Sequence, residues 1–481
     1  MDKQSTWKWI DENREEFIKI SDKIWEYAEL GLVETKSSKI IAETLERHGF
    51  KVQLGVAGMP TGILAEYGEG KPVIGLMGEY DALPGLSNVA EPRKEPIIEG
   101  APGHGCGHNI HGTTALAAAI AIRYTMEKEG LVGTIKFYGT PAEENYGGKV
   151  YMVTAGLFDD VDACLSHHPS ELNVAGMSSS TATNDYKFEF FGKTAHAAGS
   201  PEQGRSALDA VELMNIGVNY LREHVIQEAR IHYVIEEGGG QPNVVPDYAR
   251  SWYYIRAPER SQLKPITERI LKIAEGAAMM TETRLNAIHM GGLYNLIPNK
   301  VLSDAITVNM REIGPPSYTE EELEFAKAID ATVSREEKMG MLRASKHPEW
   351  ERFVDVIMDT EVHDPWDDGI TSAGSTDVAD VSWKTPTLEF QTATNVLGTP
   401  GHDWRWVACG SMSIGHKSLI FAAKTMAGTA LDLLTSPEMI KEAKAELRKR
   451  LGDQKYVPVK PDDEPPLEIA REKAEQLKGK Q

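Results

Sequence analysis

The sequence contains few cysteines, no long apolar run and no excess of positive charge. Its three cysteines, Cys106, Cys164 and Cys409, are too few for a disulfide framework, which favours a reducing compartment such as the cytoplasm. No run of about 18 apolar residues is present, and the N-terminal segment lacks the apolar core of a signal peptide, so we expect no membrane-spanning helix. The net charge of −21 argues against nucleic-acid partners and against binding to anionic membranes.

The composition is that of an ordinary globular protein. With 481 residues, of which 41% are hydrophobic and 26% charged, the chain is long enough for two domains. Short apolar strands alternate with helices in the first part, which is typical of an α/β domain. We expect strands over 62–67, 72–77, 134–139 and 162–166, and helices over 7–30, 36–48, 113–129 and 148–155. Ligands of such domains bind beyond the carboxyl ends of the strands.

The pattern changes near residue 183. We expect strands over 186–191, 230–236, 248–256 and 283–289, and helices over 206–223 and 261–280. This βαββαβ order is the ferredoxin-like pattern and is complete in itself. We therefore predict a second domain of residues 183–293, inserted into a discontinuous first domain of residues 1–182 and 294–481.

The chain then returns to the first domain. We expect an acidic amphipathic helix over 318–337, a surface loop over 338–348 and a closing helix over 418–434. The segment YVPVKPDDEPP after Gly452 predicts a Pro-rich linker with a short charged helix behind it.

The segment GHGCGHNIHG, residues 103–112, concentrates candidate metal ligands. His104, Cys106, His108 and His111 lie between glycines, which let the backbone bring side chains onto one point. Thiolate and imidazole are ligands that zinc prefers. The segment precedes a helix, whose N-terminus would favour the thiolate of Cys106. The alternative is a Gly-rich turn with incidental histidines.

Other candidate ligands follow strands or turns elsewhere in the chain. They are Glu143 or Glu144, His167 or His168, and His402. Together with Cys106 and His108, this set can hold one metal ion, or two ions about 3.5–4 Å apart as in two-metal hydrolytic sites.

The two adjacent pairs have different interpretations. The side chains of Glu143 and Glu144 point in different directions, so one can bind metal while the other accepts a proton from an activated water. A solvated turn is the alternative for this pair. We favour His168 over His167 as a ligand because Pro169 restricts its backbone; the other histidine would be a packed or capping residue.

Three candidates lie in the predicted second domain. They are His196 in GKTAHAA, Asn243 in GGGQPN and Arg256 in YIR. A Gly-rich turn with an Asn can offer amides to a carboxylate, and Arg256 can pair with one bidentately. Taken alone, each also has an ordinary structural explanation on the surface or in the core.

Eight segments together resemble the M20 family of metallopeptidases, and within it the subfamily D amidohydrolase branch. They are GEYDALPG, GHGCGHN, GTPAEE, HHP, GKTAHAAGSPEQGRSALDA, GGQPNVVP, STDVADVSW and TPGHDW, and the resemblance covers about residues 7–435. It implies an α/β catalytic domain with a mostly parallel sheet and an inserted lid domain through which two chains dimerise. It also implies five metal ligands: Cys106, His108, Glu144, His168 and His402.

The resemblance also implies roles for other candidates. Glu143 would be the general base, His196 would stabilise the oxyanion in the neighbouring subunit's site, and Asn243 would help to hold the substrate. Many members of the family have His-x-Asp where this chain has Glu79-Tyr80-Asp81. A ligand role for Glu79 is therefore in doubt, and Asp81 is left as a carboxylate that orients a ligand.

The sequence therefore predicts a metal-dependent amidohydrolase that acts on small N-acyl or N-aroyl amino acids. The thiolate favours Zn²⁺, and the branch also uses Mn²⁺; we expect two ions in each subunit. We expect a homodimer through the lid, with assembly with a related subunit as a further option. The alternatives are a dipeptidase or carboxypeptidase with the same site, and a non-catalytic partner subunit of a related hydrolase.

Overall fold

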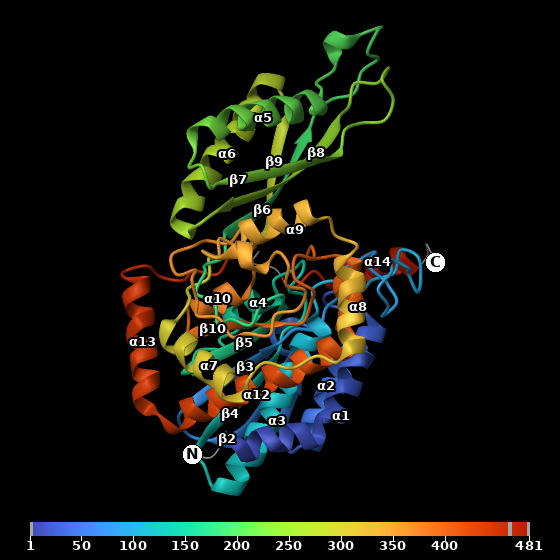
Figure 1. Cartoon of the computed structure of the whole chain (residues 1–481). Helices are drawn as coiled ribbons and strands as arrows, with labels where there is room; N and C mark the ends of the chain where they lie inside the picture. The colour runs from blue at the N-terminus through green and yellow to red at the C-terminus, as the bar shows by residue number, and fades with distance from the viewer. Residues whose placement is uncertain (1–2, 460–463, 479–481) are drawn as a thin grey trace.

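The computed structural model describes residues 3–459 and 464–478 and contains two β-sheets, each with its own hydrophobic core. Figure 1 shows the smaller sheet, with helices α5 and α6, above the larger sheet and its helices. Within the described residues, no helix is both long and apolar enough to cross a membrane.

The larger sheet has six strands in the order β1-β2-β4-β3-β5-β10. They are β1 (Lys51–Leu54), β2 (Ile63–Glu69), β3 (Val73–Gly78), β4 (Gly133–Gly139), β5 (Ala163–Ser170) and β10 (Thr387–Ala393). Strands β4, β3, β5 and β10 are parallel, while β1 and β2 pair antiparallel at one edge, so the sheet is mostly parallel as predicted. The carboxyl ends of the four parallel strands meet at one edge of the sheet.

Helices cover both faces of this sheet. The main core joins it to α1 (Gln4–Tyr27), α2 (Thr35–Arg47), α3 (His108–Glu129), α7 (Lys300–Ile313), α12 (Ser413–Thr435) and α13 (Pro437–Leu451). Another cluster joins it to α4 (Gly148–Thr154), α10 (Val378–Ser382) and α14 (Leu467–Lys478). Residues 115–122 of α3 are fully buried, because α3 lies between the sheet and the helices α1 and α12.

The remaining helices outside the smaller sheet are short. They are α8 (Glu320–Asp330), α9 (Arg335–Ala344) and α11 (Trp404–Gly410), with the 3-10 helices η1 (Val56–Gly58) and η4 (Trp350–Phe353).

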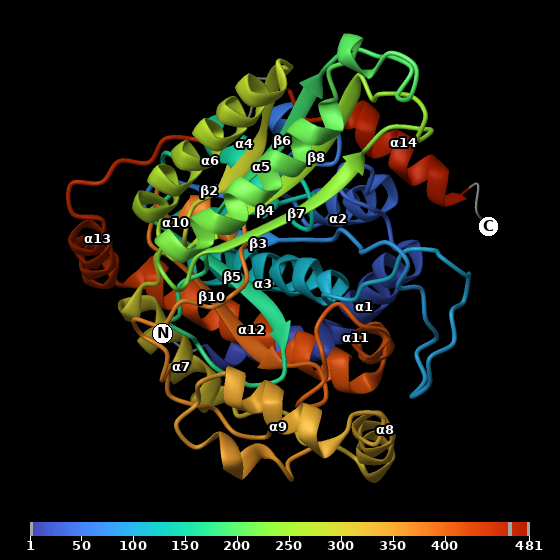
Figure 2. The ribbon, with the colours of Figure 1, turned by 90° about the horizontal axis from the view of Figure 1, so that it is seen from above.

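The smaller sheet is antiparallel, with the order β7-β8-β6-β9. Its elements are β6 (Ala182–Phe191), η2 (Pro201–Gln203), α5 (Ala207–Leu221), η3 (Arg222–His224), β7 (Arg230–Glu237), β8 (Tyr248–Ala257), α6 (Arg260–Thr281) and β9 (Arg284–Leu293). Both helices pack on one face of the sheet, as Figure 2 shows from above. The predicted ferredoxin-like βαββαβ unit is therefore confirmed, and the chain returns from it to the larger sheet at β10.

Several boundaries differ from the prediction. Helix α3 begins at His108 and not at Thr113, because Gly107 turns the chain with φ of 78° directly before it. The single helix expected over 318–337 is two helices, and Thr319 and Ser334 begin them with capping boxes. Helix α9 therefore occupies most of the expected surface loop, and α7 and α13 have no counterpart among the expected helices. The expected charged helix after the linker is α14, while residues 460–463 of the linker lie outside the described residues.

Candidate metal centre

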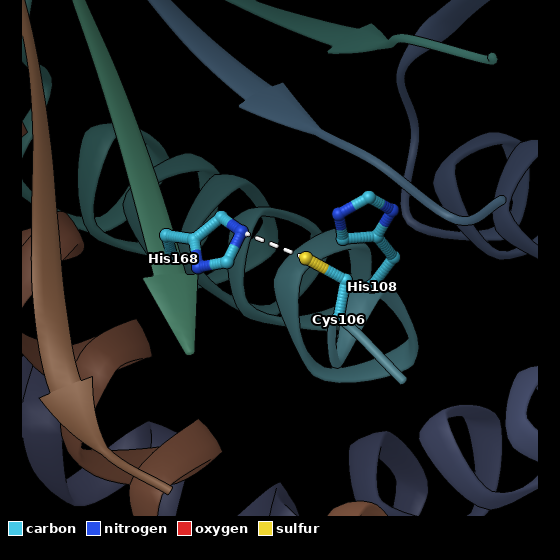
Figure 3. Close-up of side chains that lie close together, drawn as sticks. All are labelled: Cys106, His108 and His168. Atoms are coloured by element: carbon cyan, nitrogen blue, oxygen red, sulfur yellow. Dashed lines mark hydrogen bonds between the residues drawn. The ribbon is translucent and has the colours of Figure 1, made fainter. Parts of the chain in front are cut away.

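Three predicted ligands lie together where the Gly-rich loop meets the end of β5. Cys106 Sγ is 3.4 Å from His168 Nε2, and ligand atoms of Cys106, His108 and His168 all lie within 4.8 Å of one another (Figure 3). A Cβ on Gly107 would be 2.9 Å from Pro169 Cβ, so glycine at this position lets the loop approach the strand.

The other two predicted ligands join Cys106 from a different side. Ligand atoms of Cys106, Glu144 and His402 also lie within 4.8 Å of one another, and His402 Nε2 is 3.6 Å from Glu144 Oε2. His402 and Ala142, which precedes the two glutamates, have positive φ of 55° and 61°. Such conformations cost about 1–2 kcal/mol per non-glycine residue and concentrate at functional sites. The five residues thus form two donor groups that share Cys106.

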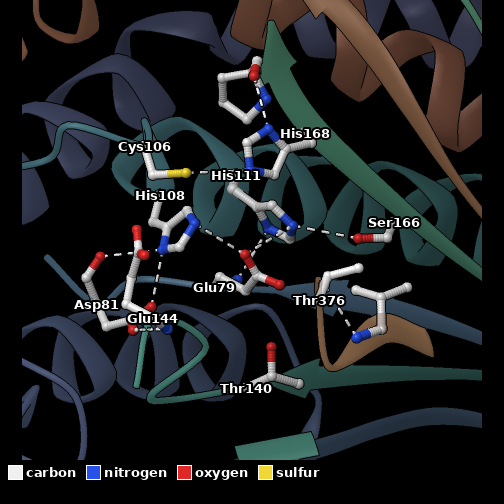
Figure 4. Close-up of polar contacts among 12 residues, drawn as sticks. Glu79, Asp81, Cys106, His108, His111, Thr140, Glu144, Ser166, His168 and Thr376 are labelled. Carbon is white, nitrogen blue, oxygen red and sulfur yellow. Dashed lines mark hydrogen bonds and ion pairs between the residues drawn. The ribbon is translucent and has the colours of Figure 1, made fainter. Parts of the chain in front are cut away.

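Hydrogen bonds determine which ring nitrogens of His108 and His168 face the two donor groups. His108 Nδ1 donates to Asp81 Oδ1 at 2.9 Å, and Asp81 Oδ2 accepts the backbone N–H of Glu144 at 2.9 Å (Figure 4). His168 Nδ1 donates to the Pro169 carbonyl at 2.7 Å. The Nε2 lone pairs of both histidines are therefore left for a cation. Asp81 therefore holds the ring of His108, which the sequence predicts to be a ligand.

The residues present fit a divalent cation. His108 Nε2 and Glu144 Oε1 are buried without a hydrogen-bond partner, and His108 Nε2 faces Glu79 Oε2 at 3.1 Å. A bare nitrogen lone pair facing a carboxylate oxygen is unfavourable unless a proton or a cation lies near both. A thiol, imidazoles and a carboxylate form the donor set of a borderline-soft ion such as Zn²⁺.

The N-terminus of α3 alone does not ionise the Cys106 thiol. Burial raises the pKa of the Cys106 thiol far above its usual range, and Glu144 raises it further. Burial likewise raises the pKa of Glu144 to about 7. A bound cation would reverse both effects, because it favours the ionised thiolate and carboxylate.

The predicted general base lies beside the first donor group. Carboxylate and imidazole atoms of Glu143, Glu79 and His108 lie within 4.8 Å of one another. Burial raises the pKa of Glu143 well above its ordinary value, and the negative charges of Glu79 and Glu144 add to this effect. A carboxylate with a raised pKa binds a proton more readily at neutral pH.

Three other histidines near the cluster have structural contacts. His104 Nε2 lies 3.0 Å from the Ile24 carbonyl, and His167 Nε2 lies 2.7 Å from Thr392 Oγ1. His111 Nδ1 accepts the backbone N–H of Glu79 at 2.9 Å. Burial lowers the pKa of His111 to about 3. Its neutral ring therefore carries its proton on Nε2 and has no lone pair left for a metal ion.

The sequence analysis gave no role to four charged residues near the donor groups. They are Glu34, Lys149 and Asp377, which are fully buried, and Glu389, which is partly buried. Burial lowers the pKa of Lys149, but Asp377 and Glu79 outweigh this and raise it above its ordinary value. For Lys149, the signal available was a lysine inside the apolar segment GKVYMVT.

His196 and Asn243 lie together, but at the outer end of the smaller sheet. The Ala197 N–H donates to the Asn243 carbonyl at 3.0 Å. The loops that carry both residues follow Phe191 and precede Tyr248, at the opposite end of β6 and β8 from the connection to the larger sheet (Figure 1). Ten-residue strands span about 30 Å, so neither residue reaches the donor groups of its own chain.

Arg256 lies at the other end of β8, near that connection. Its Nη1 donates to Ser375 Oγ at 3.2 Å, while its Nε is buried without a partner. Part of the guanidinium therefore has no hydrogen-bond partner among the described residues of the chain.

Comparison with known proteins decides the family. The sequence profile of peptidase family M20/M25/M40 matches residues 75–481. The chain belongs to this family. A relative from Escherichia coli, one of the subunits of p-aminobenzoyl-glutamate hydrolase, is 41% identical over 456 residues, which are 93% of this chain and 95% of that protein. Xaa-Arg dipeptidase of Mus musculus is 27% identical over 463 residues, 93% of this chain and 92% of that protein.

The fold is also that of a solved M20 structure. A dinuclear metal-binding peptidase of the M20 family from Bacillus subtilis has a TM-score of 0.58 and 18% sequence identity, and the match covers 88% of this chain and 99% of that one. The resemblance drawn from the eight sequence segments is thus confirmed, and with it the assignment of this M20 protein as a metal-dependent hydrolase.

Proposed function

We propose that this M20 protein cleaves the amide bond of an N-acyl or N-aroyl amino acid. The observation that carries the proposal is the two donor groups that share Cys106, with the Glu143 carboxylate beside them. The first substrate to test is p-aminobenzoyl-glutamate, because the Escherichia coli relative is a subunit of the hydrolase named for that compound.

The five predicted ligands would hold the metal. A divalent cation, Zn²⁺ or Mn²⁺, would polarise the amide carbonyl and lower the pKa of a water molecule. Two donor groups fit two ions, and the thiol favours Zn²⁺. Asp81 holds His108 and the backbone of Glu144 in place for this task.

Glu143 would move the proton. It accepts a proton from the attacking water and returns it to the nitrogen of the leaving amino acid. Its burial and the neighbouring carboxylates raise its pKa, which favours the first of these transfers, from the water to Glu143.

Residues 183–293 would act as the lid and as the dimer interface. The loops of His196 and Asn243 lie far from the donor groups of their own chain, so these side chains would complete the site of a partner copy. There His196 would stabilise the oxyanion, and Asn243 would hold the substrate. Arg256, at the inner end of the lid, would pair with the substrate carboxylate.

We also infer a cytoplasmic location from the three cysteines, and a homodimer as the basic assembly. A related subunit is a further partner to test, because the Escherichia coli relative is named as one subunit of a hydrolase. Purification of the protein alone and together with a related chain, followed by mass determination, distinguishes the two assemblies.

The decisive experiment replaces the base. Glu143→Gln should lower kcat by about 10²-fold or more and keep the metal content of the wild type. Glu322→Gln is the matched control, because Glu322 is a buried glutamate that caps α8 away from the site. Near-wild-type turnover by Glu143→Gln would show that another group is the base.

A dipeptidase is the second candidate, favoured by the similarity to Xaa-Arg dipeptidase over 93% of the chain. A panel of N-acylated Glu, Asp and apolar amino acids, assayed beside free-amino dipeptides, separates the two. Hydrolysis of the dipeptides alone would replace the amidohydrolase proposal.

A further inference from the structure

A buried ion network lies beside the donor groups, and two of its members, Lys149 and Asp377, have no part in the chemistry above. The Lys149 ammonium is 2.5 Å from Glu79 Oε1 and 2.6 Å from Asp377 Oδ1, and none of the three side chains is more than 1% exposed. Desolvation of such charges costs several kcal/mol per ion, and buried ion pairs often add nothing to stability. A purely stabilising role therefore does not explain the network.

A further metal ion does not explain it either. Glu79, His111 and Glu389 offer ligand atoms within 4.8 Å of one another. His111 Nδ1 is already an acceptor for the Glu79 N–H, however, so the ring has no second lone pair to give. The Lys149 ammonium, in contact with Glu79, already supplies the positive charge at this place.

Both carboxylates of the network hold a part of the site. Glu79 Oε2 is 3.1 Å from His108 Nε2, so the pair with Lys149 fixes the carboxylate against a predicted ligand. Asp377 Oδ2 accepts the backbone N–H of Lys149 at 2.9 Å, in addition to the ion pair. Asp377 thus binds Lys149 through both main chain and side chain at the start of α4, directly after the turn of Glu143 and Glu144.

Asp377 is itself held by the connection to the lid. The Thr181 N–H, directly before β6, donates to the Gly374 carbonyl at 2.8 Å. Ser375 Oγ donates to the Thr181 carbonyl at 2.9 Å and accepts from Arg256 at 3.2 Å. The segment that carries Asp377 is therefore fixed to both the first strand and the third strand of the lid.

We propose that Lys149 and Asp377 are positioning residues of the hydrolytic site. Lys149 holds Glu79 against His108, and Asp377 holds Lys149 together with the turn of Glu143 and Glu144. The inference rests on the proposed function for its kinetic readout. Metal affinity gives a readout that does not depend on it.

The test compares two aspartates that each accept a backbone N–H and pair with a lysine. Asp162 resembles Asp377, because it accepts the Val73 N–H at 2.8 Å and pairs with Lys71 at 3.1 Å, but it lies before β5 at the opposite end of that strand from His168. Asp377→Asn and Asp162→Asn should both lower the urea midpoint of unfolding. Only Asp377→Asn should weaken Zn²⁺ affinity in chelator competition by about 10-fold or more and lower kcat by about 10-fold with little change in KM.

Equal Zn²⁺ affinities and equal kcat values in the two variants would overturn the proposal. If the wild type hydrolyses no substrate of the panel, the proposed function fails, whereas the Zn²⁺ affinities still decide the role of the network.

A double variant tests Lys149 while removing one charge of each sign. Lys149→Met alone leaves two uncompensated buried carboxylates and is expected to fold poorly. The double variant Lys149→Met with Asp377→Asn removes one charge of each sign and should fold, yet bind Zn²⁺ about 10-fold or more weakly. Lys136→Met, which removes the ion pairs with Glu66 and Asp160 elsewhere in the sheet, should keep wild-type affinity. Wild-type Zn²⁺ affinity in the double variant would contradict the assignment.

Discussion

The direction of single side chains decides which histidine reaches the cluster. His167 and His168 are neighbours within β5, because the strand extends to Ser170, and neighbouring side chains in a strand point to opposite faces. The structure brings His168 to Cys106 and His167 to Thr392. The sequence indicates His167 and His168 as candidate ligands because they follow an apolar run. Which of the two faces Cys106 depends on the register of β5.

The pair gives a matched test. His168→Ala should weaken Zn²⁺ affinity by about 10-fold or more, because it removes a lone pair aimed at the cluster. His167→Ala should leave that affinity unchanged and lower the free energy of unfolding by about 1–3 kcal/mol, because it removes a buried imidazole ring together with its hydrogen bond to Thr392. Chelator competition and urea unfolding of both variants check this, and reversed effects would assign the ligand to His167.

A buried glutamate near the turn of Glu143 and Glu144 predicts a pH dependence of stability. Glu34 accepts the backbone N–H of Ala142 at 2.8 Å, and burial, with help from Asp81, raises its pKa to about 8 from 4.5. The folded state therefore binds this proton more tightly than the unfolded state. The stability it contributes is complete below pH 4.5 and is lost as the pH rises to about 8.

Replacing this glutamate should remove the effect. Glu34→Gln should be more stable than the wild type at pH 8, by up to about 1.4 kcal/mol for each unit of pKa shift, and should differ less at pH 5. Urea unfolding of both proteins at the two pH values measures this. A wild type that loses no stability relative to Glu34→Gln between pH 5 and 8 would rule out the raised pKa.

At the start of α4, the helix approaches the preceding turn so closely that only glycine fits. A Cβ on Gly148, the first residue of α4, would lie 1.9 Å from the Pro141 carbonyl oxygen, across the turn that carries Glu143 and Glu144. The sequence predicted the strand before this turn and the helix after it, since both follow from local patterns. It could not predict Lys149 and Glu79 as partners, because their contact depends on how β3 and α4 pack.

This close approach can be tested with two glycines in helices. Gly148→Ala should displace the turn of Glu143 and Glu144, lower the free energy of unfolding by about 1–3 kcal/mol and reduce kcat. Gly276→Ala in α6 is the control; nothing lies within 4 Å of its added Cβ, and alanine should stabilise the helix by about 0.5–1 kcal/mol. Thermal unfolding and kinetics of both variants are sufficient, and a fully active Gly148→Ala would show that the turn tolerates the displacement.

At the scale of the whole molecule, the order of strands explains why the donors converge. Glu79 and Asp81 follow β3, Glu143 and Glu144 follow β4, and His168 lies near the end of β5, three adjacent parallel strands. The alternation of strands and helices was enough to predict this edge and the inserted unit. The position of His196 in space was not predictable from its own segment, because it depends on the direction of β6.

Mixing two inactive variants should restore activity if residues of one chain's smaller sheet act on the partner's site in a dimer. Glu143→Gln lacks the proposed base, and His196→Ala lacks the proposed oxyanion contact, but a mixed dimer contains one site with both groups intact. Equal mixing with free exchange should give about a quarter of wild-type activity, since half of the dimers are mixed and each has one working site. Mass spectrometry verifies the mixed dimers, and their complete inactivity would exclude a shared site.

The placement of His196 and Asn243 at the outer end of the lid has a consequence for regulation. A single chain contains all five predicted metal ligands but, on the proposed arrangement, only part of the residues that act on the substrate. Turnover per chain would then fall on dilution below the dissociation constant of the dimer, with the metal still bound. The abundance of the protein in its compartment would itself set whether the enzyme is on or off.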